Sequence, residues 1–115
     1  MTIEPDALDA LRAAPVHHAL LFENDFVRVL DTCIPPGART PVHTHCWPAV
    51  LHVLSWSTFV RRDAEGRTML DSRTKPELAR SPGTMWTGPL PAHSLENVGA
   101  SDLHVIAVEV KNAGG

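Results

Sequence analysis

The chain has 115 residues, of which 43% are hydrophobic and 20% charged, as expected for one folded domain with a single hydrophobic core. A formal net charge of -3 gives no electrostatic basis for nucleic-acid binding, and no apolar run approaches the roughly 20 residues of a membrane-spanning helix. The acidic first residues lack the basic and apolar regions of a signal peptide, so we expect a cytoplasmic protein without membrane contacts.

Residues 1–18 are predicted as an N-terminal extension with one short helix over residues 4–14. Acidic residues near the start of this segment and an arginine near its end agree with the helix dipole, and Pro15 ends the helix. His17 and His18 follow in an extended segment. Because adjacent residues of a strand point to opposite faces, this pair is a poor chelator of one metal ion.

Residues 19–111 are predicted to fold into short strands joined by turns. The ten prolines of the chain disfavour a helical bundle. Residues 71–81 are polar, contain Pro76 and are expected to form a surface loop. Eight or more short strands in one small domain indicate an all-β sandwich or barrel. The expected strands are 20–22, 26–30, 43–45, 49–54, 57–62, 67–70, 83–86, 93–97 and the most apolar one, 103–110.

Two histidines of the third expected strand are the first candidates for a functional site. His43 and His45 lie two residues apart, so their side chains leave the same face of a strand with their backbones roughly 6.6 Å apart. Both imidazoles can then reach one metal ion. The pair alone is a modest signal, because two histidines on one strand face can also be exposed to solvent.

The surrounding spacing resembles the two sequence motifs of the cupin superfamily. The first motif is G-x5-H-x-H-x3-4-E-x6-G and the second is G-x5-P-x-G-x2-H-x3-N. Gly37, His43 and His45 match the first motif, and Gly83, Pro89, His93 and Asn97 fit the second. The resemblance covers about residues 25–110. It implies a jelly-roll barrel (a double-stranded β-helix) with a short N-terminal helix, in one cupin domain over residues 1–115.

Three departures from these motifs alter the implied metal site. The motif glutamate would fall at Ala49 or Val50, the closing glycine falls near Trp56, and Pro91 replaces a glycine of the second motif. No carboxylate is evident near the histidines in the sequence. The resemblance therefore implies a divalent metal ion held by three histidines alone: His43, His45 and His93.

Three neutral imidazoles would leave a divalent ion its full positive charge, which favours an anionic ligand or hydroxide in its open positions. Iron(II) is the favoured metal, with zinc, nickel and manganese as alternatives. A degenerate cupin that keeps its histidines without a physiological metal is the competing interpretation.

Three further residues are weaker candidates for binding a small-molecule substrate. Trp47 and Trp86 flank motif positions, where large rings would narrow the mouth of a pocket, although core or dimer packing is the simpler interpretation. Arg61 would supply a guanidinium for a substrate carboxylate, although most such arginines are solvated. Structural roles are expected for four others: reduced thiols at Cys33 and Cys46, a turn-holding amide at Asn97, and a hydrogen-bonded barrel histidine at His104.

Three functions remain open at this point. Three-histidine iron(II) sites are similar to those of thiol dioxygenases and of a β-diketone-cleaving dioxygenase, which implies oxygen chemistry on a small anionic or chelating substrate. The first alternative is a non-catalytic small-ligand-binding or sensing module, and the second is a Lewis-acid metal isomerase. The apolar strands also favour a homodimer that pairs through an outer sheet.

Overall fold

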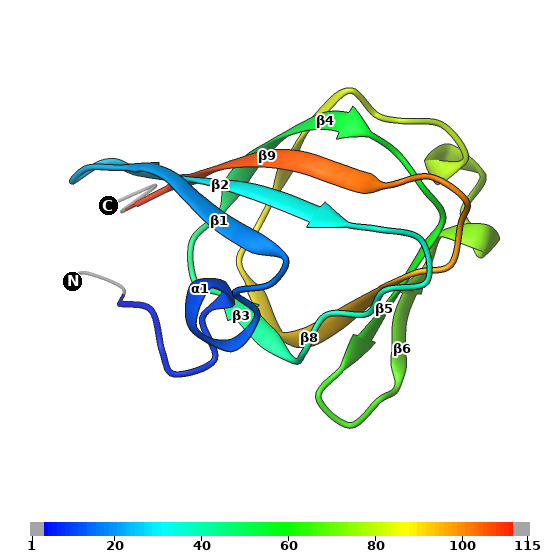
Figure 1. The fold of residues 1–115 in the computed structure, drawn as a ribbon, viewed down its shortest axis with the longest axis horizontal. Helices are drawn as coiled ribbons and strands as arrows, with labels where there is room; N and C mark the ends of the chain where they lie inside the picture. Colours follow the sequence, from blue (N-terminus) through cyan, green and yellow to red (C-terminus); the bar gives the residue numbers. More distant parts are fainter. Residues whose placement is uncertain (1–3, 112–115) are drawn as a thin grey trace.

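The structure is a computed structural model that describes residues 4–111, and it is built from two antiparallel sheets that face each other (Figure 1). The five-stranded sheet has the order β1-β2-β9-β4-β7, and the four-stranded sheet has the order β3-β8-β5-β6. The elements are α1 (Ala10–Ala13), β1 (His18–Glu23), β2 (Val27–Ile34), β3 (His43–His45), β4 (Ala49–Ser55), β5 (Phe59–Asp63), β6 (Thr68–Asp71), the 3-10 turns η1 (Ser72–Thr74) and η2 (Pro76–Leu78), β7 (Thr84–Thr87), β8 (Leu90–Asn97) and β9 (Leu103–Val110).

All nine expected strands are present, and the predicted all-β jelly-roll class is confirmed. The outer limits of the predicted domain, residues 1 and 115, lie outside the described part of the chain. The expected loop 71–81 contains η1 and η2 and is tied to the barrel by Trp56, whose indole Nε1 donates to the carbonyl of Leu78 at 2.9 Å.

The predicted helix 4–14 is wrong in length, because α1 covers only Ala10–Ala13. The residues before it pair with β3 instead: the amide of Thr44 donates to the carbonyl of Leu8 at 2.7 Å, and Asp9 forms a parallel bridge with Thr44. Asp9 then caps the helix by accepting from the amide of Leu11. Pairing with the exposed edge of a short strand outweighs local helix propensity here.

The two ends of the barrel differ in what fills them. At one end Ile34, Phe59 and Leu103 form a buried apolar cluster. At the other end α1 packs against β1 and β3 (Figure 1). The histidine-bearing strand β3 therefore lies beneath the N-terminal segment, so this segment covers the part of the barrel that holds the candidate site.

Asn97 has the structural role expected of it. Its amide is fully buried, and it donates to the carbonyls of Ile34 and Ser101 at 2.8 Å each. Its carbonyl accepts from the hydroxyl of Ser57 at 2.7 Å and from the amide of Gly99 at 3.0 Å. One side chain thus satisfies four polar groups where β8 ends.

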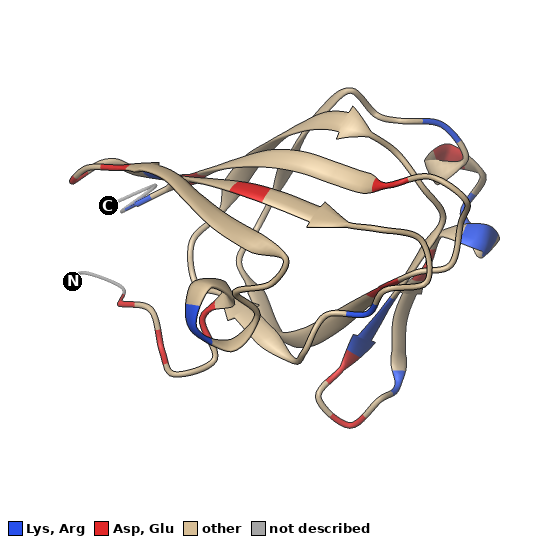
Figure 2. Cartoon of the chain, viewed as in Figure 1, with Lys and Arg blue, Asp and Glu red and all other residues tan. Residues whose placement is uncertain are grey.

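Charged residues of both signs occur along the described part of the chain. Figure 2 shows acidic and basic segments interspersed along the chain, with no continuous basic stripe in that view. Within residues 4–111, none of the helical segments has the length and apolar character needed to cross a bilayer.

Candidate metal centre

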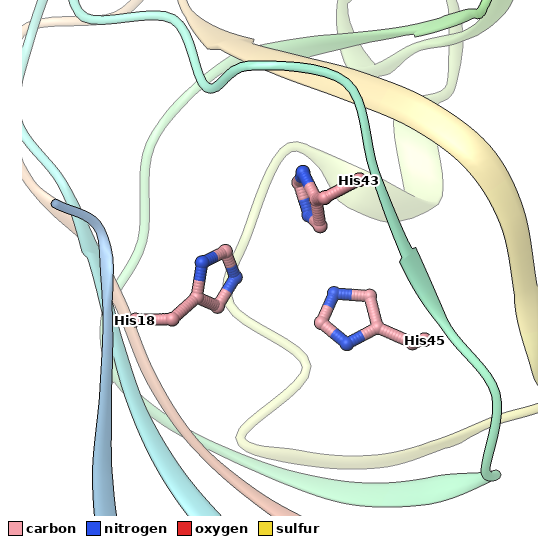
Figure 3. Close-up of side chains that lie close together, drawn as sticks. All are labelled: His18, His43 and His45. Atoms are coloured by element: carbon pink, nitrogen blue, oxygen red, sulfur yellow. The ribbon is translucent and has the colours of Figure 1, made fainter. Parts of the chain in front are cut away.

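Four histidine rings converge inside the barrel, beneath the N-terminal segment. His18 begins β1, His43 and His45 form the ends of β3, and His93 lies opposite His43 on β8. Ring nitrogens of His18, His43 and His45 lie within 4.8 Å of one another (Figure 3). The ring centroid of His93 is 4.4 Å from that of His43 and 5.6 Å from that of His45. The two sequence motifs therefore meet inside the barrel. Among residues 4–111, however, the histidines whose ring nitrogens all lie within 4.8 Å of one another are His18, His43 and His45, and His93 lies outside that group.

Each of the four rings is oriented by an oxygen acceptor at Nδ1. His18 contacts the carbonyl of Ala14 at 2.9 Å, and His45 contacts the carboxylate of Glu109 at 3.3 Å. His43 and His93 each contact the carbonyl of the proline two residues earlier, at 2.8 and 2.7 Å. Because these oxygens only accept, we assign the proton to Nδ1 in every ring, which leaves the Nε2 lone pair free. Metal-ligating histidines are held by this kind of contact.

The rings of His18, His43 and His93 are kept neutral by their surroundings. Burial is the main cause that lowers the pKa of His18 and of His43 to about 4, and the pKa of His93 to about 3, and the neighbouring histidines lower them further. At neutral pH these three imidazoles are therefore unprotonated. A cluster of neutral imidazole donors suits a divalent transition-metal ion.

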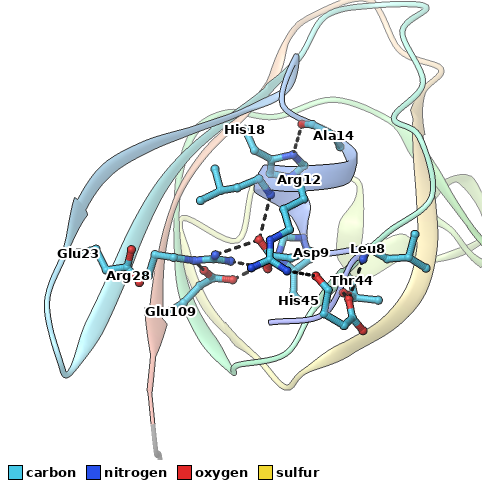
Figure 4. A network of polar contacts seen from close by, with 12 residues as sticks. Leu8, Asp9, Arg12, Ala14, His18, Glu23, Arg28, Thr44, His45 and Glu109 are labelled. Atoms are coloured by element: carbon cyan, nitrogen blue, oxygen red, sulfur yellow. Dashed lines mark hydrogen bonds and ion pairs between the residues drawn. The ribbon is translucent and has the colours of Figure 1, made fainter. Parts of the chain in front are cut away.

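A buried carboxylate lies beside the cluster, contrary to the expectation from the sequence. Glu109 on β9 contacts His45 with one oxygen and accepts from Nε of Arg28 at 2.5 Å with the other. Arg28 also donates from its two terminal nitrogens to Asp9, at 3.0 and 2.8 Å (Figure 4). All three residues are at most 3% exposed. This network links the N-terminal segment, through β2 and β9, to a histidine of the candidate centre.

The charge of this network differs from the expectation that a bound metal ion would keep its full positive charge. Burial alone would raise the pKa of Asp9 and of Glu109, but the hydrogen bonds that both carboxylates accept keep the two pKa values below their usual range. Two carboxylates and one guanidinium leave one net negative charge against His45. The positive charge of a metal ion bound by the histidines would therefore be partly neutralised by this network, which contacts His45.

The histidines open onto a cavity of about 160 Å³ inside the barrel. Arg61 and Trp47 line this cavity, as the sequence suggested. Trp86 does not: its side chain is 57% exposed, while its neighbours Met85 and Thr87 line the cavity. Strand alternation turns Trp86 to the outer face of β7, so its predicted contact with a ligand in the cavity is not supported.

His104 is hydrogen-bonded as expected, but not inside the barrel. Its Nε2 lies 2.8 Å from a carboxylate oxygen of Asp31. Its neighbours Leu103 and Val105 line the cavity, so His104 faces outward. Cys33 and Cys46 are partly buried free thiols, in agreement with the prediction.

Sequence reasoning missed His18. His17 and His18 do not act as a pair, since Nδ1 of His17 contacts the carbonyl of Cys33 while His18 faces the cluster. The same alternation that excludes the pair requires one of the two residues to face the interior. Which one does so depends on the register of β1 against β2, where His18 lies opposite Thr32, a residue of the cavity wall.

Comparison with known proteins gives matches in structure only. No protein-family model matches the chain, and neither does any curated protein. A cupin domain from Bordetella pertussis Tohama I superposes with a TM-score of 0.60 at 17% identity, over 82% of this chain and 91% of that one. An RmlC-like cupin with a double-stranded β-helix fold from Methanocaldococcus jannaschii gives 0.57 at 10% identity, over 84% and 81%.

A third similar structure is the polyketide cyclase RemF from Streptomyces resistomycificus. It gives a TM-score of 0.53 at 17% identity, over 90% of this chain and 74% of that one. At these identities the likeness concerns the fold. Together with the two-sheet topology and the cluster of histidines inside the barrel, it shows that this chain has the cupin fold.

Proposed function

We propose that this protein binds one divalent metal ion through His43, His45 and His93, with His18 as a fourth donor. The observation that carries the proposal is that all four rings have Nδ1 engaged by an oxygen and Nε2 free, within one cluster. Such a set has the donors and the outer contacts of a built metal site.

The number of histidine donors bears on the kind of site. Four imidazoles would fill the shell of a tetrahedral zinc ion and close it, as in structural zinc sites. A six-coordinate ion such as iron(II) would keep two positions open for ligands. Imidazole donors also suit iron, zinc and nickel better than manganese, which prefers oxygen. We therefore favour iron(II) in a site that stays open to the cavity.

For the reaction we propose oxygen-dependent, dioxygenase-like chemistry on a small anionic or chelating substrate. A redox-active metal, when bound, would supply the activation of oxygen. The chain itself contributes the rest: the histidines hold the ion, Glu109 orients His45, and the largely apolar walls keep bulk water from the cavity. Trp47 and Arg61 are the proposed substrate contacts in the cavity wall.

Two alternatives keep the same metal site but differ in chemistry. A non-catalytic binding or sensing module would hold metal and ligand without turnover. A Lewis-acid enzyme, such as an isomerase, would polarise a substrate carbonyl without redox change. RemF, whose fold is similar, is named as a polyketide cyclase, and this name supports the inclusion of a non-redox alternative.

The test begins with metal content. Protein purified without added metal is analysed by inductively coupled plasma mass spectrometry, alongside His43→Ala and His93→Ala. Exposed His52, on the outer side of β4, supplies the matched control His52→Ala. We expect close to one metal ion per chain, lost in the first two variants and kept in the control. Equal metal content in all four proteins would refute the site.

Oxygen uptake then separates the functions. An oxygen electrode measures consumption by the iron-loaded protein with thiols and with β-diketones. Substrate-dependent uptake supports the oxygenase. A zinc- or nickel-containing protein without uptake favours the binding or Lewis-acid alternative.

We further propose a homodimer that packs through the outer face of the five-stranded sheet. Directly opposed residues form one apolar row across all five strands. The row consists of Phe22, Val29, Val108, Val50 and Trp86. Phe22 and Trp86 are 54% and 57% exposed. Sheets bury such faces against each other in sandwiches, and a self-complementary apolar face fits a two-fold symmetric pair.

A charge introduced into the middle of this row tests the dimer. Light scattering coupled to size exclusion should give a dimer mass for the native chain and a monomer mass for Val108→Lys. Met69→Lys, on the other sheet, is the control and should remain dimeric. A native chain that is monomeric at high concentration would refute the proposal.

A further inference from the structure

Arg61 has a position in the cavity that its neighbour Arg62 does not share. Both lie on β5, and alternation turns Phe59 and Arg61 inward. Arg61 lies opposite Leu70 and Leu95, which line the same cavity. Arg62 faces the other side and donates to Glu96 at 2.8 Å. The inward arginine thus places its side chain against an apolar wall.

Arg61 also lacks a counter-ion. Its Nε is buried without a hydrogen-bond partner, and no carboxylate within residues 4–111 forms an ion pair with its guanidinium. Arg28, which is buried outside the lining of this cavity, is held by two carboxylates at 2.5 to 3.0 Å. Desolvation acts on Arg61 unopposed and lowers its pKa, without making it neutral at ordinary pH. A desolvated cation without a partner destabilises a protein. An anionic ligand that pairs with the guanidinium would offset this cost.

The anionic group of a ligand bound to Arg61 would lie close to the histidines. β5 and β8 are adjacent, with Arg61 opposite Leu95 and Asp63 opposite His93. Arg61 and His93 therefore lie on one wall, separated by a single step of inward-facing residues along the strands. A compact ligand can contact the guanidinium with one end and approach the histidine cluster with the other.

The size and lining of the cavity restrict the rest of the ligand. A volume of about 160 Å³ is close to the roughly 150 Å³ of a cavity that holds benzene. Beyond the histidines, Arg61 and Glu109, the hydroxyl side chains that line the cavity within residues 4–111 are those of Thr32 and Thr87, and the wall is otherwise mostly apolar. A sugar or polyol would leave several hydroxyl groups without partners there.

We propose that the cavity binds a small carboxylate with an apolar body about the size of a benzene ring, its carboxylate on the guanidinium of Arg61. This deepens the proposed metal function by naming the ligand class of the same cavity. The contact with Arg61 does not itself require the metal, so it can be tested on protein freed of metal by a chelator.

The experiment is isothermal titration of the metal-free protein with benzoate as the probe and benzamide as its neutral counterpart. We expect benzoate to bind and benzamide to bind much more weakly. Arg61→Met should weaken benzoate binding roughly 10- to 100-fold, the range for a lost charge-assisted hydrogen-bond pair. Arg62→Met, which removes the outward-facing arginine, should leave benzoate affinity unchanged.

A second measurement guards against loss of fold. Because Arg61→Met removes a partly buried guanidinium that has no ion-pair partner among residues 4–111, its thermal midpoint without ligand should be equal to or above that of the native chain. Equal binding of benzoate and benzamide, or unchanged benzoate affinity in a folded Arg61→Met protein, would overturn the proposal. Metal content measured on the same variant separates the carboxylate proposal from the metal proposal, because Arg61→Met should bind as much metal as the native chain. If the metal proposal fails, the native protein will contain no metal but will still bind benzoate.

Discussion

Replacing Arg28 by methionine is the sharpest test of the buried network beside the candidate metal centre. The change removes three hydrogen bonds and leaves Asp9 and Glu109 as desolvated carboxylates without their cation. Loss of one partner of a buried ion pair costs about 3–5 kcal/mol. Protonation limits the cost at each carboxyl separately: taking one carboxyl with an ordinary pKa of about 4 to its neutral form at pH 7 costs about 4 kcal/mol, at 1.36 kcal/mol per pH unit. We therefore expect the free energy of unfolding to fall by about 3–5 kcal/mol.

That loss is a large part of the roughly 5–15 kcal/mol that stabilises a typical domain, so it is easily measured. Urea denaturation at pH 7, followed by far-ultraviolet circular dichroism, gives the difference. The triple variant Arg28→Met/Asp9→Asn/Glu109→Gln leaves no buried charge in the network and should recover at least half of the loss.

The stability difference between the native chain and Arg28→Met should also change with pH in a defined direction. In the native chain both carboxyl pKa values are held below their ordinary values, so their stabilisation is complete above about pH 5 and is lost as the pH falls through the lowered values. Arg28→Met lacks this contribution, so the gap between the two proteins should narrow below about pH 4. A loss under about 1 kcal/mol, or a triple variant no more stable than the single one, would refute the reasoning.

Three further predictions concern single side chains. Glu109→Gln should weaken metal binding roughly 10- to 100-fold, because outer contacts of ligating histidines typically contribute that much; competition with a chromogenic chelator measures it, and unchanged affinity would argue against a role at His45. His18→Ala should weaken metal binding and alter the visible spectrum of the cobalt-substituted protein by one donor, whereas His17→Ala should do neither. Asn97→Ala should lower the free energy of unfolding by about 2–4 kcal/mol, since its four partners lose a buried hydrogen bond; a smaller loss in urea denaturation would mean that water replaces the amide.

The fold and three of the four clustered histidines could be predicted from local pattern and motif spacing. Alternating apolar residues between prolines and glycines predicted the strands, and the spacing around His43 and His45 predicted their shared face. These are short-range properties: a strand has a period of two, and a turn residue acts on its own backbone. His93 was found in the same way, through a second motif with its own spacing.

Tertiary structure decided which distant residues meet. Glu109 reaches His45 across 64 positions of sequence, and Asp9 reaches Arg28 because residues before α1 pair with β3 instead of continuing the helix. His18 enters the cluster only through the register of β1 on β2. Register, edge pairing and barrel closure are long-range events that no local pattern encodes. The sequence by itself therefore determined a β-barrel with a motif-based histidine set and named Arg61 as a weaker candidate. Only the folded barrel added His18 as the fourth ring and Glu109 as the carboxylate that contacts His45, and only it placed Arg61 on the cavity wall without an ion pair among residues 4–111.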